Sequence, residues 1–186
     1  MVFVRNFLSF LIVFAFILLP TAIGQVVSTT PKVVDKGSIT VVGVSKNYGM
    51  STKSKPLFDQ WTSFLNQATS ISNQNKKNEY LGISIPKSWT KFDYITGVSV
   101  SSAGSIPAGL TSTVVPAQKY ALFTFKGSLN AYEKETDNML GKYLKESKLK
   151  WNQEAPLIEV FKSGAFTPEN MQSSTNEIDL YVPLKN

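Results

Sequence analysis

The sequence predicts an α+β domain of two duplicated βαββ halves, which form an antiparallel sheet with one helix per half and a central cleft. Two observations carry this prediction. The order strand, helix, strand, strand occurs twice after residue 37. Each helix-like segment also has a single apolar face, which must be buried against another element such as a sheet. With 186 residues, 42% of them hydrophobic, the chain is long enough for one such domain with its own core.

The first half begins with the strand-like run ITVVGV over Ile39–Val44. A helix is expected next, with Ser54 as its N-cap and Pro56 in its first turn. Two strands are then expected, over Tyr80–Ile85 and Tyr94–Val100. The apolar face of the helix consists of Leu57, Phe58, Trp61, Phe64, Leu65 and Ala68.

The second half repeats this order. Its helix is expected to begin near Asn130, which forms a capping-box pattern with Glu133, and to end at about Ser147. Strands are expected over Thr111–Val115, Lys119–Phe125, Leu157–Phe161 and Glu177–Val182. The apolar face of this second helix consists of Leu129, Tyr132, Thr136, Met139, Leu140, Tyr143 and Leu144.

The N-terminal segment has the pattern of an export signal. Arg5 precedes an apolar run from Phe7 to Leu19, shorter than the roughly 20 residues of a membrane span. Ala22 and Gly24 then offer small residues for cleavage before Gln25. We therefore expect a signal peptide at 1–24 that engages the membrane or the export machinery, a spacer at 25–37, a binding domain at 38–186, and a periplasmic or secreted location. The alternative is an uncleaved N-terminal membrane anchor.

Composition excludes several classes of chemistry. The chain contains no cysteine and no histidine, so thiol catalysis, disulfides, His/Cys zinc sites and Ser-His-Asp triads are impossible. We expect no metal and no cofactor. The formal charge is +6, but the lysines are scattered and form no dense basic block between aromatics. A solvated lysine-rich surface is therefore favoured over nucleic-acid binding.

Glu159 is a carboxylate in the middle of the short apolar strand LIEVF. Alternation along the strand places Ile158 and Val160 on one face, and Glu159 and Phe161 on the other. We expect the helices to cover the first of these faces, together with Ile178, Leu180 and Val182. Glu159, Phe161 and Tyr181 would then share the opposite face and line the cleft. A solvated surface carboxylate is the alternative, but neighbouring ring faces suit an apolar cation.

Five segments in order resemble the GyrI-like, or AraC-type, effector-binding domains, the ligand-sensing part of multidrug-responsive activators. They are EYLGISI (Glu79–Ile85), FDYITGVSV (Phe92–Val100), VPAQKYALFTFKG (Val115–Gly127), APLIEVF (Ala155–Phe161) and EIDLYVPL (Glu177–Leu184).

This resemblance implies a cleft that binds lipophilic cations or aromatic molecules, with Glu159 at its base and Tyr94 and Tyr181 beside it. Many family members have tyrosine where this chain has Phe161, which keeps a ring but loses a hydroxyl. The loop residue Trp89 is a candidate lid, and Tyr80 is a further candidate for the cleft lining. The resemblance does not extend to the helix-turn-helix segment of the activators, so DNA binding is disfavoured.

Three functions follow as alternatives. The favoured one is an exported binding protein for small apolar or cationic molecules, without catalysis. The second is a GyrI-like hydrolase of reactive small molecules, in which Glu159 is the general base and Trp89 covers the substrate. The third is a tetrapyrrole binder, as in a distantly related family of the same duplicated fold. The oligomeric state is left open by the sequence.

Overall fold

A computed structural model describes residues 25–49, 54–162 and 173–185 of the chain. The described part contains one antiparallel sheet, with strand order β1-β7-β9-β8-β4-β5-β3-β6 and β2 paired beside β1 on β7. The strands are β1 (Gln25–Val26), β2 (Lys32–Lys36), β3 (Ile39–Gly49), β4 (Tyr80–Ser88), β5 (Lys91–Val100), β6 (Thr111–Val115), β7 (Gln118–Lys126), β8 (Leu157–Phe161) and β9 (Glu177–Pro183). The predicted α+β class is confirmed.

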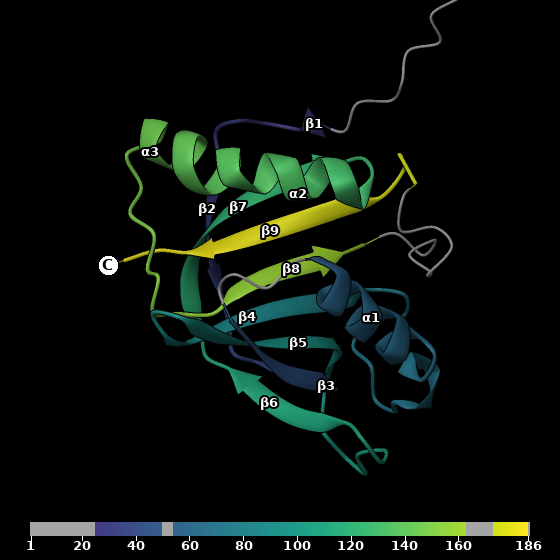
Figure 1. Ribbon diagram of the computed structural model, residues 1–186. Helices are drawn as coiled ribbons and strands as arrows, with labels where there is room; N and C mark the ends of the chain where they lie inside the picture. Colours follow the sequence, from purple (N-terminus) through teal and green to yellow (C-terminus); the bar gives the residue numbers. More distant parts are fainter. Residues whose placement is uncertain (1–24, 50–53, 163–172, 186) are drawn as a thin grey trace, which may run out of the picture.

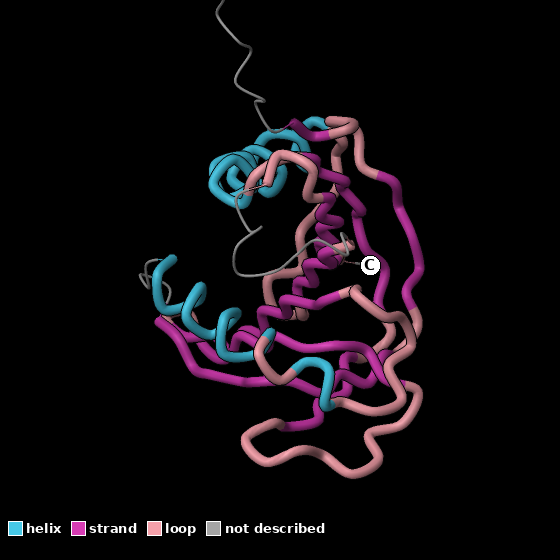
Figure 2. The backbone as a smooth tube through the Cα atoms, turned by 90° about the vertical axis from the view of Figure 1, so that its right-hand side faces the viewer, coloured by secondary structure: helices cyan, strands magenta, loops and turns pink. Residues whose placement is uncertain are grey.

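Two helical segments lie on the same side of this curved sheet (Figure 1, Figure 2). The first consists of α1 (Ser54–Leu65) and the short turn η1 (Ala68–Ser70). The second is continuous from α2 (Leu129–Asp137) through the π-helical η2 (Asn138–Tyr143) to α3 (Leu144–Glu146). It begins after Ser128, whose Oγ accepts a hydrogen bond from the Ala131 N–H at 3.3 Å. The N-cap is therefore Ser128 and not the predicted Asn130.

The predicted duplication is present in the strand order. From the centre outwards, the first half runs β4-β5-β3 and the second half runs β8-β9-β7. The two halves meet where β4 pairs with β8. Each half thus contributes one strand to the middle of the sheet, where a side chain can contact elements of both halves.

The first half is preceded by strands that the sequence pattern does not indicate. Residues 25–37, which we expect to be a spacer, contain β1 and β2, and both pair with β7 of the second half. In the same way β6, which leads into the second half, pairs with β3 of the first half. The strands that precede each half in the sequence therefore pair with the outer strand of the other half: β1 and β2 with β7, and β6 with β3. β2 has the sequence KVVDK and lies in a segment rich in threonine, serine and proline, so its short apolar pattern resembles part of a polar linker.

Both faces of the sheet are buried, and each carries its own core. The helix-side core contains Trp61, Phe64, Tyr94, Phe123, Phe125, Tyr132, Met139, Phe161, Ile178, Leu180 and Val182, among others. The opposite core contains Val41, Leu81, Ile83, Ile95, Val115, Tyr120, Ile158 and Val160.

This division corrects the predicted facing of β8. Phe161 belongs to the helix-side core, whereas Ile158 and Val160 belong to the opposite core. Ile178, Leu180 and Val182 do face the helices, as expected. The register pairs Phe161 with Ile178 and places them on one face. The predicted grouping was wrong because both faces of β8 are apolar, so alternation alone does not tell which face the helices cover.

The expected signal peptide or anchor at 1–24 lies outside the described residues. Among the described residues, no helix combines the length and the apolar character that crossing a bilayer requires.

Candidate functional site

Glu159 lies in the middle of β8, at the junction of the two halves. Its ladder partners are Gly82 in β4 and Leu180 in β9. Its side chain points to the helix side of the sheet, where two helix-side core residues contact it. The residue remains partly exposed to solvent. A single carboxylate thus lies between α1 and α2 at the centre of the sheet.

Both carboxylate oxygens of Glu159 accept hydrogen bonds from tyrosines, one from each half. The hydroxyl of Tyr94 in β5 donates to Oε2 at 2.7 Å. The hydroxyl of Tyr132 in α2 donates to Oε1 at 2.9 Å. Both tyrosines are buried, with 5% and 3% of their surface exposed. The carboxylate is therefore satisfied by neutral donors, which leave its negative charge in place.

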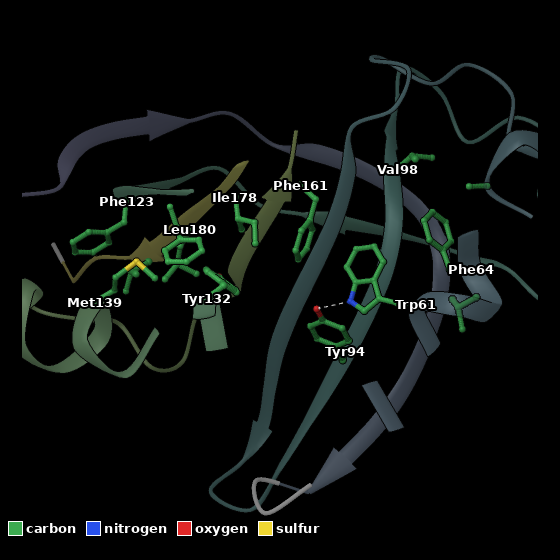
Figure 3. Close-up of a cluster of buried hydrophobic side chains, with 14 of the residues drawn as sticks. Trp61, Phe64, Tyr94, Val98, Phe123, Tyr132, Met139, Phe161, Ile178 and Leu180 are labelled. Carbon is green, nitrogen blue, oxygen red and sulfur yellow. Dashed lines mark hydrogen bonds between the residues drawn. The ribbon is translucent and has the colours of Figure 1, made fainter. Parts of the chain in front are cut away.

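Aromatic rings extend from this carboxylate into the first half. The indole N–H of Trp61 in α1 donates to the Tyr94 hydroxyl at 3.2 Å, as the dashed line in Figure 3 shows. The Trp61 ring meets the Phe161 ring edge-to-face, with centroids 4.8 Å apart. On the other side, Tyr132 packs against Phe125 with centroids 5.5 Å apart. Five aromatic residues on five elements thus form a connected group around one carboxylate.

A buried glutamine holds α1 in the position that this arrangement needs. The Gln60 Nε2 donates to the backbone carbonyls of Val44 and Tyr94, both at 2.9 Å. Its Oε1 accepts from the Tyr48 hydroxyl at 2.9 Å. Gln60 is fully buried, so these bonds are shielded from water and tie the helix to β3 and β5. The neighbouring Trp61 is thereby oriented toward Tyr94.

The electrostatics of the site follow from burial. Burial raises the pKa of Glu159, and the hydrogen bonds from Tyr94 and Tyr132 oppose that shift by stabilising the ionised form. Burial, and then the charge of Glu159, hold the pKa of each tyrosine well above its usual value. Both tyrosines therefore remain protonated donors at neutral pH.

Within the described residues, Glu159 forms no ion pair, and the salt bridges found lie between other groups. The same residues contain no group of three or more acidic side chains arranged to hold a metal ion. A negative charge surrounded by rings and neutral donors can attract a cation with an apolar or aromatic surface. Among the residues that the structure describes, none pairs its positive charge with Glu159 and would compete with such a ligand.

Gly82 supplies the space in which Tyr94 meets Glu159. A Cβ at position 82 would lie 2.4 Å from the Tyr94 Oη and 2.6 Å from the Glu159 Oε2. Both distances are too short for non-bonded atoms. The hydrogen bond between these two side chains therefore depends on glycine at the ladder position opposite Glu159.

The structure brings together three of the predicted site residues: Glu159, Tyr94 and Phe161. Tyr80 lies on the same face as Phe161, its ladder partner, and its ring meets Phe64 with centroids 5.8 Å apart. Trp89 is 92% exposed in the turn between β4 and β5. Its role as a lid, like the ligand-binding role of the other five residues, stays a prediction.

Tyr181 is not part of this group, which corrects the sequence-based placement. It packs on the opposite core, where its ring meets Tyr120 with centroids 5.9 Å apart and the Lys36 Nζ lies 4.6 Å from its centroid. In the ladder it pairs with Ile158, one position out of phase with Glu159. Asp179, on the same face as Tyr181, forms an ion pair with Lys162 at 2.7 Å. Neither residue can therefore act beside Glu159.

Sequence reasoning missed three residues of the site: Tyr132, Trp61 and Gly82. Tyr132 and Trp61 carry the signal of a helix core face, and both are indeed buried, but their polar atoms also serve the carboxylate network. A buried tyrosine or tryptophan needs a partner for its O–H or N–H, and this need is the available signal. Gly82 follows only from the register of β4 and β8.

Two cavities of the described part of the chain lie away from Glu159, which is not among their lining residues. One lies beside Tyr80 and the loop before β4, and the other lies beside α3 and Trp151. The predicted hollow next to Glu159 is thus not one of these two.

Comparison with known proteins identifies a matching family and one curated relative. A family model described as "Cass2: Integron-associated effector binding protein" matches residues 32–184. The transcriptional regulator BrlR of Pseudomonas aeruginosa is 29% identical over 97 residues, which are 52% of this chain and 35% of the regulator. The chain thus spans about a third of the length of this curated relative.

Solved structures share the fold at low identity. The structure of SAV2435 bound to tetraphenylphosphonium has a TM-score of 0.68 and 18% identity, over 84% of this chain and 94% of that one. The integron cassette protein VCH_CASS2 of Vibrio cholerae has a TM-score of 0.62 and 14% identity, over 87% of this chain and 99% of that one. At these identities, both likenesses show a shared fold.

Proposed function

Because the chain belongs to the family of integron-associated effector binding proteins, we propose that it is a receptor for small lipophilic cations and flat aromatic molecules, which it binds at Glu159. The single observation that supports this most is the Glu159 carboxylate, which is held by two buried tyrosine hydroxyls and has no cationic partner among the described residues. The ligand supplies the missing positive charge.

The rings next to Glu159 define what kind of cation fits. Tyr94 and Tyr132 already donate to both carboxylate oxygens, so a ligand gains by contributing charge and apolar surface rather than further N–H donors. Ring faces attract cations by about 0.5 to 2 kcal/mol each, with the larger values in dry sites. A bulky cation whose charge is shielded by carbon groups matches these properties. One structural neighbour is bound to tetraphenylphosphonium, a cation of this type.

Ligand entry requires side chains to move in this proposal. Trp61 and Phe161 pack edge-to-face with centroids 4.8 Å apart, and the cavities beside Tyr80 and beside Trp151 do not include Glu159. A ligand with several rings would separate these side chains and take their place beside the carboxylate. Flat rings tolerate ligands of different shape, so we expect several related cations to bind with similar affinity.

Glu159→Gln is expected to weaken binding of tetraphenylphosphonium by roughly thirtyfold, or about 2 kcal/mol, because it removes the charge but keeps the side-chain shape. Isothermal titration calorimetry with purified protein measures this difference. The matched control is Glu177→Gln, which removes a carboxylate from the opposite face of β9, where Lys126 and Lys162 pair with it. Equal affinity of the two variants would exclude the proposed role of Glu159.

Binding is also expected to depend on pH through Glu159. Burial raises its pKa above the ordinary value of 4.5, and tetraphenylphosphonium carries a permanent charge. Affinity should therefore rise with pH as the carboxylate ionises. Without ligand, the folded state binds more protons than the unfolded state between 4.5 and the raised pKa, so the free energy of unfolding should fall across the same interval. Calorimetry and urea titrations at several pH values test both trends, and Glu159→Gln should show neither.

A further inference from the structure

A cavity of about 420 Å³ lies in the first half, between η1 and the beginning of β4. Its walls are formed by η1, the loop that follows it and Tyr80. Small-molecule sites commonly have volumes of about 300 to 1,000 Å³, so this cavity can hold a molecule the size of one sugar ring. It is separate from Glu159, which is not among its lining residues.

The loop that forms this cavity presents hydrogen-bond acceptors. The Gln74 Nε2 donates to the carbonyl oxygens of Ala68 at 2.9 Å and Ile71 at 3.0 Å. Since carbonyl oxygens only accept, the amide nitrogen must face them, and the Gln74 Oε1 is left for another donor. The Asn73 Nδ2 donates a hydrogen bond to the Ser102 Oγ at 3.1 Å. Gln74 thus uses both of its N–H donors and Asn73 uses one of two, and no hydrogen bond to either amide oxygen is formed by another described residue.

Two further lining residues add polar groups to this cavity. Asn78 has a backbone φ of 60°, and its side-chain amide makes no hydrogen bond to another described residue. Its oxygen and both of its N–H donors are therefore available to a ligand. Thr69 is exposed and contributes a hydroxyl group.

One wall of the cavity is aromatic. The Tyr80 ring is half-buried and held edge-to-face against Phe64, with centroids 5.8 Å apart. Lys77 is the one charged residue among the lining residues, and it is exposed. The lining therefore combines an apolar ring surface with carboxamides and a hydroxyl, and it contains no carboxylate.

We propose that this cavity binds a neutral saccharide ring. Sugar hydroxyls both donate and accept, so they can donate to the oxygens of Gln74 and Asn73 and accept from the Asn78 amide. The apolar C–H face of the sugar would lie against Tyr80. A simple anion fits poorly, because both N–H donors of Gln74 are already used and a single exposed lysine is the only charge among the lining residues. A cation would find no carboxylate and would be repelled by Lys77.

The test is two-dimensional amide NMR of the full chain. The protein is titrated separately with D-glucose, D-galactose and N-acetyl-D-glucosamine. A final sugar concentration of roughly 50 mM covers millimolar dissociation constants. At least one of these sugars should produce saturable shifts in the amides of residues 69–80. Asn78→Ala should weaken that binding by about five- to tenfold, the effect of one lost hydrogen bond.

Asn75→Ala is the matched control, since Asn75 is an exposed asparagine of the same loop that does not line the cavity. It should bind the sugar as the wild type does. Equal weakening in the two variants would overturn the proposal, and so would the absence of shifts with all three sugars. Saturable shifts with inorganic phosphate alone would instead assign an anion site. Glu159→Gln should leave sugar binding unchanged, so this result does not depend on the receptor role of Glu159.

Discussion

Gly82→Ala is expected to break the Tyr94–Glu159 hydrogen bond and to lower the free energy of unfolding by about 1 to 3 kcal/mol, the usual cost of overpacking a well-packed site. The added Cβ would lie 2.4 Å from the Tyr94 Oη and 2.6 Å from the Glu159 Oε2. One of these side chains must move, and the partly buried carboxylate then loses the Tyr94 donor. Urea titration measures the stability, and calorimetry with tetraphenylphosphonium should show a loss of at least about tenfold in affinity.

Gly141→Ala is the control, and it is expected to raise the free energy of unfolding instead of lowering it. Gly141 lies in the helical segment η2, and a Cβ there would meet nothing within 4 Å. Alanine in a helix interior is favoured over glycine by about 0.5 to 1 kcal/mol, so this variant should be more stable than the wild type and should bind the ligand normally. If both variants shifted stability in the same direction, the contact proposed for position 82 would be wrong.

Phe161→Ala is expected to be more destabilising than Gly82→Ala, by about 3 to 5 kcal/mol relative to the wild type. Phe161 is 2% exposed and packs against Trp61 with ring centroids 4.8 Å apart. Its removal leaves a cavity between β8 and α1. Since small domains have a total stability of about 5 to 15 kcal/mol, the variant should unfold at much lower urea concentration. Urea denaturation followed by circular dichroism measures the shift.

Trp89→Ala removes an aromatic ring that is 92% exposed, and it should change stability by no more than about 0.5 kcal/mol. If Trp89→Ala and Phe161→Ala lowered the free energy of unfolding by comparable amounts, the packing role of Phe161 would be contradicted. Phe161→Leu separates stability from binding, because it keeps an apolar side chain and removes the ring face. It should remain folded and bind tetraphenylphosphonium about three- to tenfold more weakly, as expected for the loss of one cation–ring contact.

Much of the fold follows from local sequence patterns. The strands Thr111–Val115 and Leu157–Phe161 have the predicted bounds, and the remaining predicted strands differ from the observed ones by a few residues at their ends. These segments combine branched and aromatic residues with turn residues at their ends. The duplicated order was likewise visible, because each helix has a 3.6-residue apolar period that differs from the period of the strands.

The strands that precede the first half, β1 and β2, could not be found in this way. β2 consists of Lys32–Lys36, and its partner in β7 is about ninety residues further along the chain. A short strand at a sheet edge is stabilised by its ladder hydrogen bonds and by long-range packing more than by its own composition. The segment therefore resembles a linker until the other half of the molecule is present.

The sequence by itself determined that a lone carboxylate, Glu159, lies in an apolar strand, and that Phe161 shares its face while Ile158 and Val160 do not. Only the tertiary structure decided which face the helices cover. That choice brings Tyr132 and Trp61 to the site, leaves Tyr181 on the other side of the sheet, and sets Gly82 opposite the carboxylate. The reason is physical: alternation has a period of two and fixes relative facing within a strand, whereas both faces of this sheet are buried, so the absolute facing depends on register and helix packing.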